Sequence, residues 1–168
     1  MHTATTPPPR SDAHPTVDQV DVRGPRFAAW ITTGVLITVL LAASISPWLA
    51  AAILSLQAAV FAIGALFGPR RQPFGLIYTR IVAPRQGPVT EREPVGPLRF
   101  AQFVGLVFSL AGIAGFATGS TLAGQVATGF ALSAAFINAA FGICLGCQVY
   151  PLIARLNHTT RSPKERQS

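Results

Sequence analysis

Long apolar runs alternate with polar segments along the chain. None of the four runs contains Asp, Glu, Lys, Arg or His, and they cover Phe27 to Ser46, Trp48 to Gly68, Phe100 to Thr118 and Leu122 to Ile143. Each is close to the ~20 residues that an α-helix needs to cross a hydrocarbon core of ~30 Å. A helix also satisfies its own backbone hydrogen bonds in lipid. The pattern therefore predicts an all-α membrane protein with four transmembrane helices.

The first two runs are too long together for one span, and Pro47 favours a turn between them because proline suits the first turn of a helix. We expect the helices to form two hairpins joined by a cytoplasmic loop at residues 69–99. The predicted helices are at about 27–46, 48–68, 100–118 and 122–149, inside a membrane domain of residues 23–156, with a disordered tail at 1–22 and a basic tail at 157–168.

The charges predict an orientation. All 13 Lys and Arg residues precede the first run, separate the second from the third, or follow the fourth, whereas Ser44–Pro47 and Gly119–Thr121 carry no charge. The positive-inside rule then places both termini and the central loop in the cytoplasm, across the cell (inner) membrane. A net charge of +7 often indicates nucleic-acid binding, but here the basic residues only flank apolar runs, so a nucleic-acid partner is not expected and the lipid bilayer is. The expected topology anchors are Arg26, Arg70, Arg71, Arg99 and Arg155.

The polar segments differ in character. Residues 1–22 are proline-rich with few large apolar groups, which is typical of disorder. The central loop is also proline-rich, and we expect little regular structure in it. Within it, Phe74 to Ala83 mixes apolar residues with Tyr78 and Arg80, which suits either an interfacial amphipathic piece or a loop packed over the bundle.

A short sequence is repeated in the two halves of the chain. Arg26-Phe27-Ala28 opens the first predicted hairpin, and Arg99-Phe100-Ala101 opens the second. Parallel repeats about the membrane normal have this appearance.

The last apolar run has a face of small residues at helical spacing, which favours close packing against another helix. Asn138 lies within this face, and an interhelical hydrogen bond to Gln57 is the expected role of the pair. Contact with a substrate or a quinone headgroup is the alternative role of Asn138. The face comprises Ala131, Ala135, Asn138, Gly142 and Gly146.

The only two cysteines, Cys144 and Cys147, are three apart at the cytoplasmic end of that run. At the C-terminal end of a continuous helix they would be poorly activated, whereas a kink at Gly142, aided by Gly146 and Pro151, would place Cys144 at a new helix start. The alternatives are thiol redox or sulfur handling, apolar filling, and a zinc site shared across a homo-oligomer. No metal site is evident within one chain.

Several stretches together carry a family resemblance: Arg23 to Phe27, Gln57 to Phe61, Arg99 to Gln102, and Asn138 to Cys147, which ends in Phe-Gly-x-Cys-x-Gly-Cys. Through them the chain resembles the bacterial membrane family called domain of unknown function 4395, from about Val20 to Leu156. This resemblance implies a four-helix membrane protein. Because members of the family are often encoded near thioredoxin-like and sulfurtransferase proteins, it also implies a link to thiol or sulfur metabolism. Family members commonly carry Glu or Asp where this chain has Gln148.

Two functions follow from these observations. In the first, Cys144 and Cys147 form a catalytic thiol pair that relays electrons or sulfur to a cytoplasmic thioredoxin-like or sulfurtransferase partner. A quinone is considered as a further partner, although no quinone site or other cofactor is evident in the sequence. In the second, the protein is a non-enzymatic membrane subunit or scaffold that packs against a partner protein.

Overall fold

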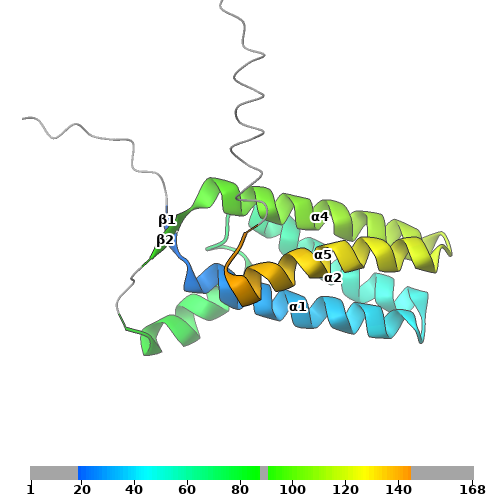
Figure 1. Ribbon diagram of the computed structural model, residues 1–168, viewed down its shortest axis with the longest axis horizontal. Coiled ribbons are helices and arrows are strands. Elements are labelled where there is room, and N and C mark those ends of the chain that lie inside the picture. Colours follow the sequence, from blue (N-terminus) through cyan, green and yellow to red (C-terminus); the bar gives the residue numbers. More distant parts are fainter. Residues whose placement is uncertain (1–18, 88–90, 145–168) are drawn as a thin grey trace, which may run out of the picture.

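The computed structural model describes residues 19–87 and 91–144. Within these ranges, four long helices lie side by side and form a bundle, as Figure 1 shows. The turn from the first helix to the second and the turn from the third to the fourth lie at the same end of this bundle (Figure 1). The opposite end, called the strand end below, carries a small sheet and a short helix. The long helices are α1 (Arg23–Ala43), α2 (Pro47–Phe67), α4 (Val95–Ala117) and α5 (Thr121–Phe141).

The strand end contains regular structure where the sequence predicted a tail and an irregular loop. Strand β1 (Gln19–Asp21) pairs antiparallel with β2 (Arg92–Pro94), and Val20 of β1 is buried. The predicted disordered tail at 1–22 is therefore wrong for its last residues, because a partner distant in sequence orders them. The loop between α2 and α4 also holds α3 (Pro73–Ile77), a π-helical turn η1 (Tyr78–Val82) and a 3₁₀ turn η2 (Ala83–Arg85).

Helices α1 and α4 begin earlier than the apolar runs indicated. Their first residues are Arg23 and Val95 rather than residues 27 and 100. Pro25 and Pro97 each take the third helical position, where a backbone N–H would have no partner within the helix. In α1, the first amide hydrogen bond follows at once, from the Arg26 N–H to the Val22 carbonyl at 3.3 Å. Proline therefore marks the first turn of these helices and not the residue before them.

Helix α5 ends at Phe141, although the sequence predicted a helix to residue 149. Gly142 caps it in the left-handed conformation, with φ of 68°, and its N–H donates to the Asn138 carbonyl at 3.0 Å. Glycine adopts this conformation without a Cβ penalty, which is why it ends helices. The expected break at Gly142 is thus a helix terminus. Gly146 and Pro151 lie outside the described residues.

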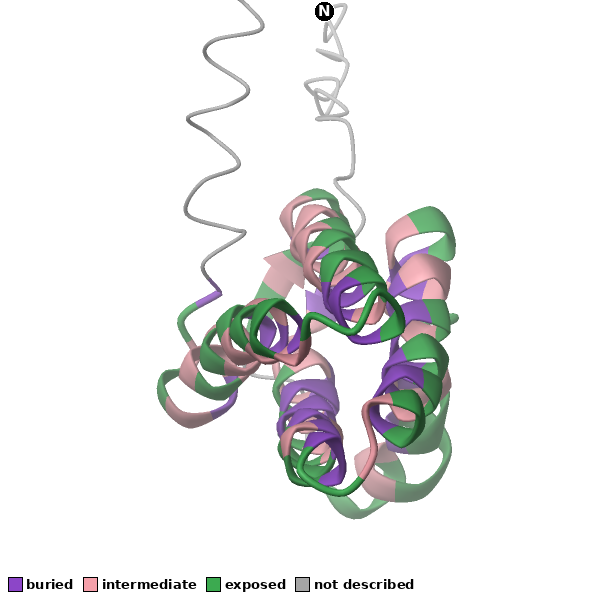
Figure 2. Ribbon diagram, turned by 90° about the vertical axis from the view of Figure 1, so that its right-hand side faces the viewer, coloured by how far each residue is buried: buried purple, intermediate pink, exposed green. Residues whose placement is uncertain are grey.

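The long helices turn their large apolar side chains outward. All four are long and apolar enough to cross a membrane, with mean hydropathies of 1.7, 2.2, 1.9 and 1.3 along the chain. Figure 2, which looks down the bundle from the end with the two turns, shows exposed positions around its outside and buried ones facing its centre. The buried positions include polar Thr32, Gln57, Ser109 and Thr128. A soluble bundle has the opposite arrangement, so this is a membrane protein.

Glycines let the helices approach closely. A Cβ on Gly115 of α4 would lie 2.5 Å from the Gly124 backbone nitrogen of α5, and one on Gly105 would lie 2.8 Å from the Phe61 ring of α2. Packing of this kind drives helix association in lipid, where no water is released from apolar surface.

The C-terminal turns of α1 and α4 have the same burial pattern, whereas their first turns do not. When Arg26 is aligned with Arg99, the positions of Leu36, Val39 and Ala42 coincide with Ser109, Gly112 and Gly115 of α4. All six are buried. Helix α1 packs against α2 and α5, and α4 packs against α5 and α2. The repeated Arg-Phe-Ala sequence therefore begins two helix pairs whose helices have equivalent neighbours in the bundle.

We predict that Gly115→Ala destabilises the bundle by about 1–3 kcal/mol, because its new Cβ meets backbone and the helices must separate. Gly34→Ala is the matched control, since a Cβ there meets nothing within 4 Å. Unfolding of the purified protein in detergent, followed by circular dichroism, measures both. Equal stability of the two variants would contradict the packing described here.

Candidate functional site

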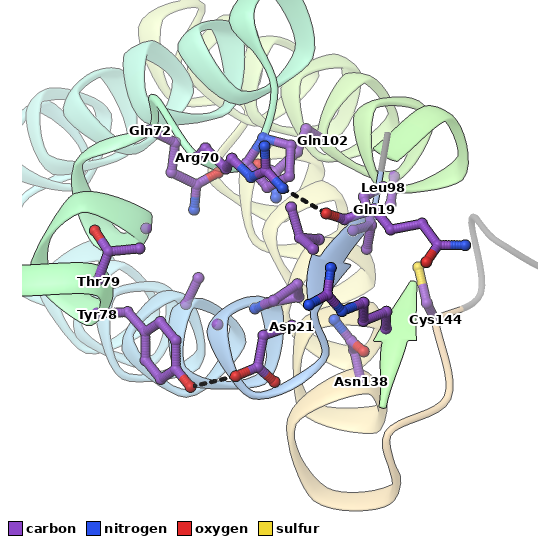
Figure 3. Close-up of a pocket in the computed structure, with 18 of the residues that line it drawn as sticks. Gln19, Asp21, Arg70, Gln72, Tyr78, Thr79, Leu98, Gln102, Asn138 and Cys144 are labelled. Carbon is purple, nitrogen blue, oxygen red and sulfur yellow. Dashed lines mark hydrogen bonds between the residues drawn. The ribbon is translucent and has the colours of Figure 1, made fainter. Parts of the chain in front are cut away.

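A cavity of about 290 Å³ lies at the strand end. Its walls come from β1, β2, the first turns of α1 and α4, the segment from Pro69 to Ala83, and the end of α5. Figure 3 shows that Tyr78 and Thr79 lie on one side of this outer cavity and that Asn138 and Cys144 lie on the other. Its polar lining includes Asp21, Arg70, Gln72, Arg92, Gln102 and Asn138.

A second space of about 100 Å³ lies between the long helices. Each of the four contributes to its mostly apolar lining, with Phe61 from α2, Phe108 from α4 and Ala131 from α5 among the residues. This inner space shares four lining residues with the outer cavity: Ala101, Gln102, Asn138 and Cys144. The two spaces are therefore adjacent, and two amides and a thiol line both of them.

Cys144 is the predicted catalytic residue that the structure describes. It follows α5 after the cap at Gly142 and is 7% exposed. Its thiol therefore borders both spaces from a segment beyond the helix, and not from the helix itself. Cys147 lies outside the described residues.

Gln57 does not form the predicted hydrogen bond to Asn138 but donates to Thr32 instead. Gln57 is 2% exposed, and its Nε2 donates to Thr32 Oγ1 at 3.4 Å. Gln57 lies in the middle of α2, whereas Asn138 lies within one turn of the strand end, so their depths differ by about 10 Å at ~1.5 Å rise per residue. Asn138 instead borders the two spaces (Figure 3).

The face of small residues on α5 is turned toward the bundle interior. Ala131, Ala135 and Asn138 line the inner space, and Gly142 caps the helix. The face thus forms a wall of the site as well as a packing surface.

Two glutamines that the sequence reasoning missed as site residues have unpartnered oxygens. Gln72 is 2% exposed, and within residues 19–87 and 91–144 neither its Oε1 nor the Oε1 of Gln102 has a hydrogen-bond partner. Both lie close to Gly64, because a Cβ there would be 2.6 Å from Gln72 Oε1 and 2.9 Å from Gln102 Oε1. Gln102 is an amide within an apolar run, and that signal was available in the sequence. Gln72 follows Arg71 in a proline-rich loop, and nothing in the local pattern marks it.

Tyr78 connects several segments of the strand end through its ring and its hydroxyl. Its ring packs against Phe27 at 5.8 Å between centroids, and its hydroxyl lies 3.1 Å from Asp21 Oδ2 and 3.1 Å from Gln86 Oε1. Burial raises the pKa of Tyr78, and the hydrogen bond to Asp21 and the charge of Asp21 raise it further. The phenol is therefore held neutral as the hydrogen-bond donor. In the described residues, no group of three His, Cys, Asp or Glu side chains is placed to hold a metal ion.

A family model described as Domain of unknown function (DUF4395) matches residues 20–155. The chain belongs to this family. A search of the curated proteins and a search of the solved structures each found no match.

Three of the arginines expected to anchor this DUF4395 protein in the membrane also hold its strand end together. Arg99 donates from Nε to the Ala65 carbonyl at 2.8 Å and from Nη2 to the Leu66 carbonyl at 2.7 Å, and so caps α2. Arg70 donates to the Gln19 carbonyl of β1, and the Arg26 guanidinium lies near Gly142 at the end of α5. Arg71 is exposed, and Arg155 lies outside the described residues.

We predict that Arg99→Gln destabilises the DUF4395 protein by about 1–2 kcal/mol, because two carbonyls at the end of α2 lose a charged donor. Arg80→Gln, at an exposed position of η1, is the matched control and changes little. Both variants keep the helices intact, so detergent unfolding curves report the difference. Identical curves for the two would show that the cap contributes nothing.

We predict that Tyr78→Phe makes the stability of the protein fall less steeply as the pH rises above about 10. Because the folded-state pKa of Tyr78 is raised above 10.0, the neutral phenol contributes stability that is fully present below that pH and is lost as the pH rises toward the folded value. The variant loses about 1 kcal/mol at neutral pH with the hydrogen bond, but its stability falls less steeply above about pH 10. Detergent unfolding measured across this pH range, with Tyr150→Phe as control, tests the prediction. Parallel pH profiles for wild type and Tyr78→Phe would contradict it.

Proposed function

We propose that this protein is an inner-membrane thiol relay in which Cys144 and Cys147 exchange electrons or sulfur with a cytoplasmic thioredoxin-like or sulfurtransferase protein. The observation that carries the proposal is the position of Cys144, a buried thiol at the point where the outer cavity meets the inner space of the bundle. Cys144 packs with the apolar side chains of Val20 and Leu98, and it also lines both spaces, as Gln102 and Asn138 do.

The proposed orientation places the strand end in the cytoplasm. The arginines of the described residues lie at or beyond this end, and the turns from Ser44 to Ser46 and from Thr118 to Ser120 carry no charge. Gln19 and Cys144, the first and last described residues, both line the outer cavity at the strand end (Figure 3). The positive-inside rule then makes two hairpins with both termini cytoplasmic, and the outer cavity opens toward the partner.

The proposed chemistry is thiol–disulfide exchange. A thiolate of the partner's dithiol attacks one sulfur of the Cys144–Cys147 disulfide, so a mixed disulfide forms and the other cysteine is released as a thiolate. The second thiol of the partner then attacks the mixed disulfide, so the partner leaves as a disulfide and Cys144 and Cys147 are reduced. Two electrons and two protons pass from the partner to the pair, and the reverse exchange runs through the same mixed disulfide.

We predict that Cys147→Ser captures a mixed disulfide on Cys144. Purified protein is reduced, freed of reductant and treated with bis(2-hydroxyethyl) disulfide, and its intact mass is measured. Wild type is expected to lose the adduct as Cys147 resolves it, whereas Cys147→Ser keeps it and releases it only when dithiothreitol is added.

Cys144→Ser is the matched control, and labelling of inverted membrane vesicles with an impermeant maleimide tests access from the cytoplasmic face. If neither thiol reacts in the folded protein while both react after denaturation, the thiols are filler. The non-enzymatic subunit or scaffold is then the better description.

A further inference from the structure

We propose that the outer cavity binds the phosphate group of a phosphate ester, with Arg70, Gln72 and Gln102 as the hydrogen-bond donors. The ester is a membrane phospholipid or a soluble molecule with the same group. Neither cysteine takes part, so the site is independent of the proposed thiol relay. Three observations support it: the direction in which the two amides are held, the charge of the lining, and the place of the cavity at the ends of the long helices.

Gly64 of α2 determines the direction of the two amides. A Cβ on Gly64 would lie 2.6 Å from Gln72 Oε1 and 2.9 Å from Gln102 Oε1, so both oxygens lie against this glycine between α2 and α4. Both oxygens are buried and accept no hydrogen bond within the described residues. The Cα–H groups of a glycine are weak donors, and they favour an oxygen over an N–H₂ group as their neighbour. Because an amide is planar, each N–H₂ group then points away from Gly64, toward the outer cavity that both side chains line.

A guanidinium group lies beside these amides. Arg70 is two residues before Gln72, and Figure 3 shows it on the same side of the cavity as both glutamines, whereas Asp21 lies on the opposite side with Tyr78. One N–H of Arg70 donates to the Gln19 carbonyl, and a guanidinium has five N–H donors in all. Guanidinium groups bind phosphate through paired, charge-assisted hydrogen bonds. This side of the cavity therefore offers N–H donors of the kind that a phosphate group accepts from.

The charges of the lining also favour an anion. Among the described residues, the lining contains two arginines, Arg70 and Arg92, and one carboxylate, that of Asp21. The carboxylate already accepts from the Tyr78 hydroxyl at 3.1 Å and from the Arg23 backbone N–H at 3.0 Å. It is therefore engaged on its own side of the cavity, and the net positive charge attracts an anion to the opposite side.

The cavity lies where the long helices end. Its walls include the first turns of α1 and α4 and the segment that follows α2, and these helices are long and apolar enough to cross a membrane. The polar headgroups of a bilayer lie at this level, just outside the hydrocarbon core. Apolar residues such as Pro25, Ala28 and Leu98 complete the lining, which suits the carbon part of a phosphate ester. With about 290 Å³, the cavity is near the lower end of the ~300–1,000 Å³ range of ligand pockets, so the bound group is small.

The test uses the full chain purified in detergent and two phosphate probes. Dioleoylphosphatidylglycerol represents the lipid source and is titrated by native mass spectrometry, with dioleoylglycerol as the matched lipid that lacks the phosphate. Glycerol 3-phosphate represents the soluble source and is titrated by calorimetry, with glycerol as its control. We expect one phosphate probe to bind per chain, and the control without phosphate to bind at least tenfold more weakly.

Variants of the three donors locate the site. Arg70→Gln, Gln72→Leu and Gln102→Leu are each expected to weaken binding of the phosphate probe by about tenfold, which corresponds to the loss of one buried hydrogen bond. Arg80→Gln is the matched control for charge, because it removes the same charge from an exposed position of η1. Gln125→Leu is the matched control for the amides, since Gln125 lies near the start of α5 at the other end of the bundle.

Gln72→Glu is a second variant at the same position. It keeps the size of the side chain but replaces the N–H₂ donor with a carboxylate oxygen, so it is expected to weaken binding at least as much as Gln72→Leu. Unfolding followed by circular dichroism shows which variants are folded, and the test does not depend on the leucine variant alone.

The outcomes decide both the site and its ligand. Loss of lipid binding in the donor variants identifies a phospholipid, and loss of glycerol 3-phosphate binding identifies a soluble ester; either result supports the site. If neither probe binds, if dioleoylglycerol binds as tightly as the phospholipid, or if the donor variants bind like Arg80→Gln and Gln125→Leu, the phosphate site is wrong. None of these results bears on the thiol relay, which is tested through its cysteines.

Discussion

The cost of leaving a polar group in hydrocarbon is the constraint on which this structure depends. The uncharged stretches of the four long helices expose many large apolar side chains, and several polar groups turn inward, where Gln57 donates to Thr32 and the hydroxyl of Thr128 donates to the Gly124 carbonyl at 2.8 Å. Because lipid gives no hydrophobic reason for helices to associate, close contact must come from shape. Glycines on α4 and α5 allow this close contact, and the bundle keeps its few buried polar groups among apolar side chains.

At the strand end, the carbonyl groups at the ends of the helices need hydrogen-bond donors. The C-terminus of α2 leaves carbonyls without partners, and Arg99 from α4 donates to two of them. Arg26 occupies the equivalent place beside Gly142 at the end of α5. Each arginine lies in the first turns of one helix and at the end of another, so these two positive charges join the two halves of the chain. This arrangement encloses the outer cavity, since the strands and α3 close over the gap between the helix ends.

The site shows what residue patterns can and cannot reveal. Cys144 and Asn138 stood out as a rare thiol and as an amide in an apolar run, and both border the junction of the two spaces. Gln57 stood out for the same reason, but it satisfies its amide on a neighbouring helix at another depth. Gln72 gave no signal, because its burial depends on the close approach of the loop to α2 and α4. A polar residue within an apolar run is a candidate site residue. Its depth along the bundle then decides which other polar residues it can contact.

The residues alone determined that the chain has four long apolar helices, where each of them lies in the sequence, and that the arginines gather outside the apolar runs, because transfer into lipid depends on local composition. The family match over residues 20–155 agrees with the resemblance found in the sequence. Only the tertiary structure decided that β1 pairs with β2, that α5 ends at Phe141 before the first cysteine, and that Gln72 and Gln102 lie together. Each of these features is stabilised by contacts between segments far apart in the chain, so a local sequence pattern does not predict it.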